Sequence, residues 1–341
     1  MRVKHLLLFI AFLFSFGTIE SAIAGDPIKI RFGIFVKKIS PEFEESKFKT
    51  EFYWWIRFEN DSNLTGISNK DILNLEYVNG VETGVDIFKD EIIEHREISP
   101  NSFYFHGFHQ GDFYFSPDFR MYPFDKQKLH ISIENTLLAE TDFVILPDEE
   151  SYSRSNQIPH MKGLSIDLIN QERESYGILK SEILSGVGVY NTDFGDPDFS
   201  PISNYSRIDT VIYLERPIIP YISKLIIPLI IILLLVYYVF FLPPDKIDIS
   251  AGLTVTSLLS AIAFQLAIGS ELPDIGYIIY SDKVFYVCYF LIALSMAQSL
   301  YTYYLDVSGD EKKVRLAANL DIIFRFIFPV LFFVPVILMA L

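Results

Sequence analysis

The sequence contains only one cysteine, Cys288, so the chain cannot form an intramolecular disulfide. Basic residues are also scarce, because 28 Lys and Arg stand against 43 Asp and Glu and leave a net charge of -15. A phosphate-binding surface needs clustered cations, so this balance argues against nucleic acid as a partner. The sequence presents neither a nucleophile–base pair nor a set of metal ligands, so we expect no enzyme, no cofactor and no metal site.

Apolar residues make up half of the 341 residues, and their distribution divides the chain. Residues 1–24 predict a secretory signal peptide, because basic residues precede an apolar run that ends in small residues before Gly25. Residues 25–216 are mixed in polarity and rich in aromatic side chains, whereas residues 217–341 hold long apolar segments. We therefore expect a domain outside the cytoplasm, followed by a membrane domain.

Four segments of the membrane domain are long and apolar enough to cross a bilayer, at about 218–242, 248–269, 282–304 and 317–341. The connections between the segments differ in charge. Lys246 precedes the second segment, and Lys312, Lys313 and Arg315 lie between the third and the fourth. In the connection between the second and the third, residues 271–282, every charged residue is acidic. Basic loops favour the cytoplasmic side, which places the N-terminal domain on the opposite side of the membrane.

One face of the second segment differs from the others. At about 100° per residue, seven of its positions fall within about 80° of one another. This stripe consists of Asp248, Gly252, Thr256, Leu259, Ala263, Leu266 and Ser270. From Asp248 to Leu266 it extends about 27 Å, close to the apolar thickness of a bilayer. A carboxylate and hydroxyls do not suit lipid, so the stripe indicates a water-filled pore formed by several copies. The alternative is a helix packed in a bundle, where small residues let neighbours approach.

The N-terminal domain shows the period-two alternation of strands and no long amphipathic helix. The clearest example is residues 52–58, where every second residue is large and apolar: Phe52, Trp54, Ile56 and Phe58. Gly, Asn, Asp and Pro separate such runs. About ten short strands predict an antiparallel β-sandwich, so the fold class is a β + α membrane protein.

The most specific motif is DFRMYPFDKQ, residues 118–127, which predicts a tight turn between two strands with a possible cis peptide bond before Pro123. Here the sequence resembles the pentameric ligand-gated ion channels, the Cys-loop receptor superfamily. The resemblance is closest to the prokaryotic members, which lack the disulfide, and Phe115 and Leu129 stand at the cysteine positions. It extends from about residue 27 to the end of the chain, and it implies ten strands followed by four helices.

The resemblance implies a homopentamer in a bacterial inner membrane, in contact with lipid and with its N-terminal domain in the periplasm. Five copies of Asp248 would then form a carboxylate ring that favours monovalent cations. Thr256 would line the pore, and Leu259 and Leu266 are the expected gate, with Ala263 between them. The alternative function is a membrane-anchored sensor of the same fold that does not conduct.

The resemblance also implies an agonist site between subunits. Tyr190 and Tyr205 fit the two aromatic positions of its flexible hairpin, and Tyr77 lies in another binding segment. The neighbouring subunit is expected to contribute Phe52 and Trp54. Aromatic faces suit an amine, but residues 134–137 lack the family's usual aromatic residue, which disfavours one. The agonist is an unidentified small molecule, a proton or hydroxide.

A third implied site couples the two domains. The resemblance places the turn around Pro123 and a first hairpin against the connection to the membrane domain. Asp125 is the expected partner of Arg216, which fits the family's arginine before the first membrane helix. Three hairpin acids, Glu42, Glu44 and Glu45, are expected to join the same charged junction. Pro273 fits the turn after the pore helix.

Overall fold

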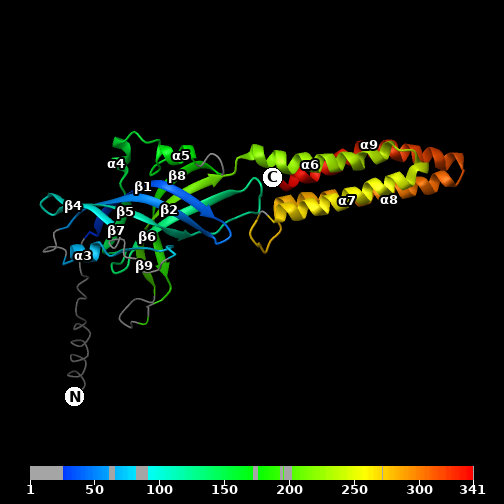
Figure 1. The fold of residues 1–341 in the computed structure, drawn as a ribbon. Coiled ribbons are helices and arrows are strands. Elements are labelled where there is room, and N and C mark those ends of the chain that lie inside the picture. The colour runs from blue at the N-terminus through cyan, green and yellow to red at the C-terminus, as the bar shows by residue number, and fades with distance from the viewer. Residues whose placement is uncertain are drawn as a thin grey trace, which may run out of the picture.

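The computed structural model describes residues 26–60, 66–81, 91–171, 176–192, 195, 202–270 and 272–340. The predicted signal peptide, residues 1–24, lies outside the described residues. A β-rich domain and a bundle of long helices lie end to end (Figure 1). The chain therefore folds into the two parts that its apolar distribution predicts.

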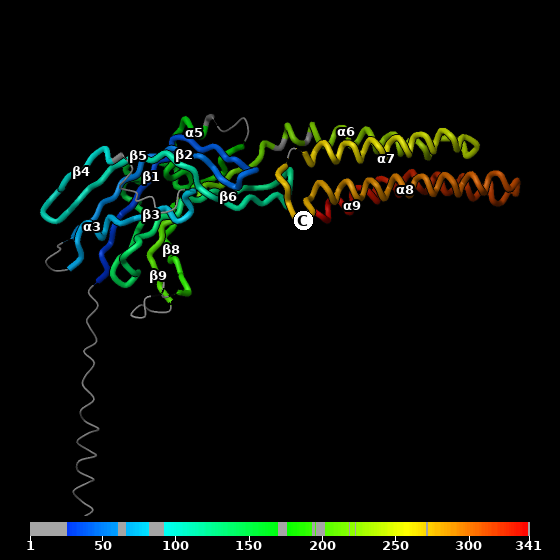
Figure 2. Tube along the Cα trace, turned by 60° about the horizontal axis from the view of Figure 1, so that its bottom comes forward, coloured from blue at the N-terminus to red at the C-terminus, as the bar shows by residue number. Residues whose placement is uncertain are grey.

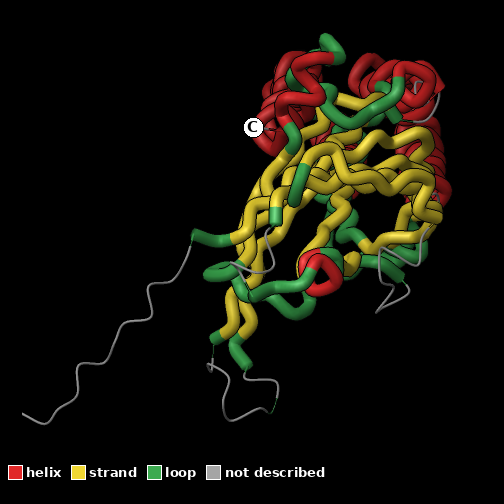
Figure 3. The backbone as a smooth tube through the Cα atoms, turned by 90° about the vertical axis from the view of Figure 1, so that its left-hand side faces the viewer, coloured by secondary structure: helices red, strands yellow, loops and turns green. Residues whose placement is uncertain are grey.

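The strands of the N-terminal domain form a sandwich (Figure 3). One of its two sheets has strand order β4-β5-β2-β1-β7, and the other has order β3-β6-β9-β8. Among the described residues there are nine strands where about ten were expected. They are β1 (Ile28–Glu42), β2 (Lys47–Glu59), β3 (Leu75–Tyr77), β4 (Glu91–Ser99), β5 (Ser102–Tyr114), β6 (Lys126–Asn135), β7 (Phe143–Pro147), β8 (Gly177–Tyr190) and β9 (Ser203–Glu215). The pairing is antiparallel except between β1 and β7.

Alternation along the strands fills the space between the sheets. On β2, Phe52, Trp54 and Ile56 are fully buried, whereas Tyr53 and Trp55 on the opposite face are partly exposed. Phe115 and Leu129, at the expected cysteine positions, both lie in this core. The core therefore replaces any disulfide as the element that holds the two sheets together.

Three short helices lie outside the sheets and were not predicted from the sequence: α3 (Asn69–Ile72), α4 (Glu149–Arg154) and α5 (Ile166–Gln171). Each has at most six residues, which is too short for a periodic apolar pattern to be recognised. Ser68 caps α3, because its hydroxyl accepts a hydrogen bond from the Asp71 backbone N–H.

The membrane domain contains four helices whose length and apolar character suit a membrane span, as predicted. They are α6 (Ile218–Tyr238), α7 (Ile247–Gly269), α8 (Tyr280–Val307) and α9 (Glu311–Ala340), with short 3-10 turns η2 (Val239–Phe241) and η3 (Pro244–Lys246) between the first two. The chain is a multi-pass membrane protein. Helices α8 and α9 are longer than expected and extend past the α6–α7 connection (Figure 1).

Candidate functional site

The α7 stripe lies on one uncovered face of the chain. All seven of its residues are exposed, and the side chains of Leu259 and Leu266 are 63% and 70% exposed. Exposed Val255 and Ile262 flank the stripe. Leucines this open on a membrane helix must contact lipid, another subunit or a pore.

The opposite face of α7 packs inside the bundle. Ser250, Thr254, Ser257 and Ala261 are buried there. Thr254 Oγ1 donates to the Ser250 carbonyl at 2.9 Å and lies 3.3 Å from the sulfur of Met296 on α8. These small residues let α7 and α8 approach closely, which is the role that the bundle alternative assigned to the stripe. Because α7 packs against the bundle through the face opposite the stripe, the stripe itself stays exposed on the surface of the described bundle.

A buried ion pair lies in the N-terminal domain where it meets the membrane domain. Arg216 follows β9, and its Nε donates to Asp125 Oδ1 at 2.7 Å. The two side chains are only 8% and 1% exposed. Gln127 holds the other carboxylate oxygen, because its Nε2 donates to Asp125 Oδ2 at 2.6 Å. The predicted contact between Asp125 and Arg216 is therefore confirmed.

Aromatic rings enclose the same guanidinium, and the sequence patterns did not indicate this. Five rings lie within 6 Å of Arg216 Cζ, at distances between 4.9 and 5.9 Å. This aromatic cage consists of Phe43, Phe119, Tyr122, Tyr176 and Tyr221. Tyr221, on α6, also accepts a hydrogen bond from Arg216 Nη1 at 3.1 Å. Burial raises the pKa of Tyr176, so its ring stays neutral beside the cation.

The turn of residues 118–125 contacts the membrane domain directly, and its Tyr122–Pro123 peptide bond is cis, as the motif suggested. The Phe119 backbone N–H donates to the Tyr277 hydroxyl at 2.9 Å, and the Tyr280 N–H donates to the Arg120 carbonyl at 2.9 Å. Buried Phe119 and Tyr122 form one apolar cluster with Ile279, which precedes α8. In Figure 2 this turn lies beside the α7–α8 connection.

The hairpin between β1 and β2 reaches the junction differently from the expectation. Glu42 pairs with Lys49 at 2.7 Å, and Glu45 pairs with Lys47, so both acids bind lysines of their own hairpin instead of Arg216. Their inclusion in the charged junction is wrong, because nearer cations on β2 neutralise them. Glu44 does lie at the junction, in a groove that Pro273 also lines. The hairpin contacts Arg216 through the ring of Phe43.

The expected agonist residues fall into two groups. Tyr190 and Tyr205 lie together, with ring centroids 5.8 Å apart. The Tyr190 hydroxyl donates to Glu134 Oε2 at 2.8 Å, and Arg207 Nε binds the other oxygen of the same carboxylate. Residues 134–137 thus contribute a carboxylate to this site in place of an aromatic ring.

Phe52, Trp54 and Tyr77 are in the wrong place for ligand contact. Phe52 and Trp54 are fully buried and Tyr77 is 5% exposed, all within the sandwich core. The expectation is wrong because the large apolar residues of a half-buried strand face the core, and only their neighbours face outward. The outward residue of this strand is Tyr53.

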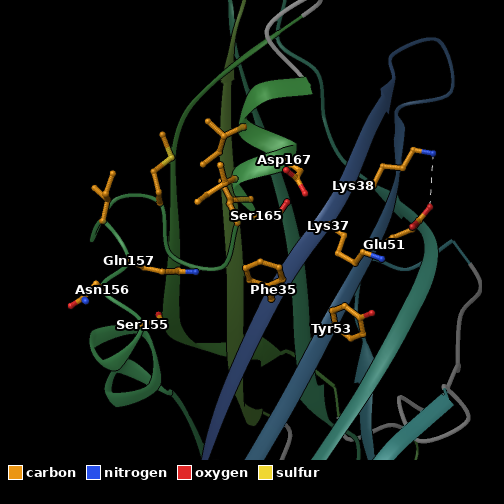
Figure 4. A pocket seen from close by; sticks show the side chains of 15 residues that line it. Phe35, Lys37, Lys38, Glu51, Tyr53, Ser155, Asn156, Gln157, Ser165 and Asp167 are labelled. Atoms are coloured by element: carbon orange, nitrogen blue, oxygen red, sulfur yellow. Dashed lines mark ion pairs between the residues drawn. The ribbon is translucent and has the colours of Figure 1, made fainter.

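Tyr53 lines a cavity of about 810 Å³ between β1, β2 and the segment 155–169 (Figure 4). Phe35 and Tyr53 form part of its floor, and Gln157 and Asp167 border it from the other side. Lys37 lies 5.5 Å from the Tyr53 ring centroid. The cavity therefore combines apolar surface with charges of both signs, which suits a small polar ligand.

Asp148 anchors the segment that covers this cavity. Its carboxylate is fully buried, accepts from Trp55 Nε1 at 2.7 Å and from Ser151 Oγ at 2.6 Å, and pairs with Arg57. Burial alone would raise the pKa of Asp148, but these hydrogen bonds and the Arg57 charge hold it below the usual value. No local sequence pattern indicates this contact between β2 and the residue that precedes α4.

The described residues thus form a β-sandwich and four helices that suit a membrane span, with an exposed stripe on α7 and a buried ion pair at the junction between the two domains. No protein-family model matches the chain. Two curated relatives do. A proton-gated ion channel of Gloeobacter violaceus is 22% identical over 223 residues, which cover 65% of this chain and 55% of the relative. The pH-sensitive chloride channel 2 of Drosophila melanogaster is 26% identical over 198 residues, which cover 55% of this chain and 34% of the relative.

The chain thus spans about half the length of one relative and about a third of the other. Both relatives are pentameric ligand-gated ion channels, and neither is an enzyme. The chain is similar to both channels, and its single cysteine is consistent with the absence of the Cys-loop disulfide.

Proposed function

We propose that this chain forms a homopentameric ion channel that external protons or a small ligand open, and that conducts cations through a pore lined by α7. The observation that carries the proposal is the α7 stripe, which stays exposed while the other face of the helix is packed against α8. One stripe cannot enclose a path, so several copies are needed, and the printed descriptions of the relatives as ion channels support this reading.

The cation preference rests on Asp248. It lies in the first turn of α7, exposed at the end of the stripe. Five such carboxylates around a narrow mouth attract cations and repel anions. One relative is described as a chloride channel, so the similarity itself does not decide the sign of the ion. The stripe of this chain has no basic residue, which favours cations.

The proposed agonist site lies at a subunit interface of the sandwich. Its supports are the Tyr190–Tyr205 pair on one part of the domain and the Tyr53 cavity on another. A proton as agonist is supported by the descriptions of both relatives, one as proton-gated and one as pH-sensitive. The proposed setting is a bacterial inner membrane with the sandwich in the periplasm, as the basic cytoplasmic loops favour.

The direct test is ion flux into liposomes that contain the purified protein. External acid or a ligand is expected to start cation flux, and Asp248→Asn is expected to lower the cation preference measured by reversal potential in a salt gradient. Asp245→Asn is the matched control, because Asp245 lies near the same end of α7 but outside the stripe. Tight, correctly oriented protein that never conducts, with or without acid, would instead support the non-conducting sensor.

A further inference from the structure

A row of side chains crosses the four-stranded sheet near the last residue of β8. Glu76 on β3 pairs in register with Glu134 on β6, and Glu134 pairs with Arg207 on β9. Side chains in register lie on the same face, and here it is the face turned away from the core, because the neighbouring Tyr77, Ile133 and Ile208 are buried. β8 contributes Tyr190, its last residue.

Three members of this row are bonded to one another. Arg207 Nε and the Tyr190 hydroxyl bind the two oxygens of the Glu134 carboxylate, the latter at 2.8 Å. We call this arrangement the clasp. Gly188 makes it possible, because a Cβ at that position would lie 2.0 Å from Glu134 Oε1. The clasp joins the last residue of β8 to β9, the two strands that flank the segment 191–202.

Glu76 is the fourth member and carries the excess charge. The row contains two carboxylates, Glu76 and Glu134, and one guanidinium, Arg207. Because Arg207 pairs with Glu134, the negative charge of Glu76 is not neutralised within the row. Glu76 has no ion pair or hydrogen bond of its side chain among the described residues. Asp71, on α3 just before β3, does not pair with Glu76 either, since its carboxylate accepts a hydrogen bond from Ser68 Oγ at 2.7 Å.

The other ionisable groups on this face either have a hydrogen-bond partner of their own or lie further along the strands from Glu76. Asp209 on β9 accepts a hydrogen bond from Ser132, and His130 lies opposite Val211. Burial, and then the charge of Glu134, raise the pKa of Glu76 above its usual value. A proton is therefore held more readily by Glu76 than by an isolated glutamate.

We propose that Glu76 is a proton-binding site through which external acid strengthens the clasp that joins β6, β8 and β9. The step is a single protonation: a proton from water binds the Glu76 carboxylate and removes one negative charge beside Glu134. Glu134 then keeps its bonds to Arg207 and Tyr190, and the negative charge of Glu76 on β3 no longer repels its carboxylate. The inference rests on the proposed proton gating, and it names the group that senses the proton.

The first test compares Glu76→Gln with the wild type in liposome flux at a series of external pH values. Glutamine resembles the protonated glutamate, so the pH of half-maximal opening is expected to rise by about one unit, or about tenfold in proton concentration. Glu140→Gln is the matched control, because Glu140 is also partly exposed near this sheet but has no glutamate in register with it. Glu76→Asp, which keeps a titrating group, is expected to stay within a few tenths of a pH unit.

The second test does not need conduction. Cys288 is buried, so a cysteine introduced at exposed Asn191 gives one labelling position for a fluorophore beside Tyr190. Its emission is expected to titrate with pH in the wild type and to lose that titration in Glu76→Gln. A wild type that never conducts but still titrates contradicts the proposed function alone. Unchanged opening and an unchanged fluorescence titration in Glu76→Gln overturn the inference, as does an equal effect of Glu140→Gln.

Discussion

Replacing Asp125 by asparagine is the sharpest perturbation of the junction between the two domains. The substitution keeps the shape of the side chain and one oxygen that can accept from Arg216. It removes the negative charge and thus leaves the guanidinium buried among aromatic rings with no carboxylate. The pair is almost inaccessible, with side chains 8% and 1% exposed, so water cannot take the place of the missing charge.

The magnitude follows from this burial. Removing one partner of a buried pair costs about 3–5 kcal/mol, and asparagine keeps one oxygen that can accept from Arg216, which places the cost at the lower end of this range. We expect Asp125→Asn to cost about 3 kcal/mol. The coupling energy with Arg216→Gln is expected near 2 kcal/mol, which corresponds to about a 30-fold change in the ratio of open to closed channels if the pair differs between the two states.

The assay is a double-mutant cycle on opening, with pentamer formation in mild detergent as the separate check on assembly. Asp118→Asn is the control: Asp118 lies in the same turn and pairs with Arg120 at 3.1 Å, but these side chains are 53% and 71% exposed. That variant is expected to change opening by less than about 1 kcal/mol.

The charge-swapped double variant, Asp125→Arg with Arg216→Asp, separates the contribution of the ion pair from that of the aromatic cage. The structure predicts no rescue, because Gln127 presents an amide donor to position 125 and the aromatic cage around position 216 suits a cation. Single variants that open normally, together with a coupling energy near zero, would refute the role of this pair in gating. Full rescue by the swap would refute the role of the cage.

Three further predictions concern the sandwich and the gate. Tyr53→Ala is expected to alter the response to a small-molecule agonist and leave the melting temperature nearly unchanged, whereas Phe52→Ala, which opens a core cavity, is expected to destabilise the protein by about 3–5 kcal/mol in thermal unfolding. Leu259→Thr is expected to increase resting flux at neutral pH, because a hydroxyl ring lowers the barrier to water; an unchanged or lower resting flux would count against the gate. The lowered pKa of Asp148 contributes stability above its unfolded pKa of about 3.9, and this stability is lost as pH falls through the folded pKa. Asp148→Asn is therefore expected to lower stability by about 2 kcal/mol at pH 7 and to flatten the acid dependence below about pH 4, because Arg57 keeps a second partner in Glu150 at 3.2 Å.

Much of the fold was accessible from local patterns in the sequence. The period-two alternation along residues 52–58 predicts a strand, and the stripe on residues 248–270 predicts an exposed face of a helix, because both depend only on neighbouring residues. The Asp125–Arg216 contact joins residues 91 positions apart and came from the family resemblance, which supplies the topology that a local pattern lacks.

The failures share a physical origin. Choosing Phe52 and Trp54 for ligand contact took the apolar face of a strand as the binding face, although hydrophobic burial directs that face inward. Placing Glu42 and Glu45 in the charged junction overlooked Lys49 and Lys47, which lie seven and two positions along the same hairpin and pair with these acids. The clasp and the aromatic cage each bring together side chains from several strands or loops, so no single stretch of sequence contains either one.

The most direct test of the pore is chemical access along α7. Single cysteines are introduced on the stripe at Thr256 and Leu259 and on the packed face at Ser250 and Ser257, in a chain whose native Cys288 is buried. A charged, water-soluble thiol reagent applied to open channels is expected to block flux through the stripe variants and to leave the packed-face variants unchanged. Modification of Ser257→Cys as fast as Thr256→Cys, or open channels whose stripe cysteines never react, would contradict a pore lined by this face.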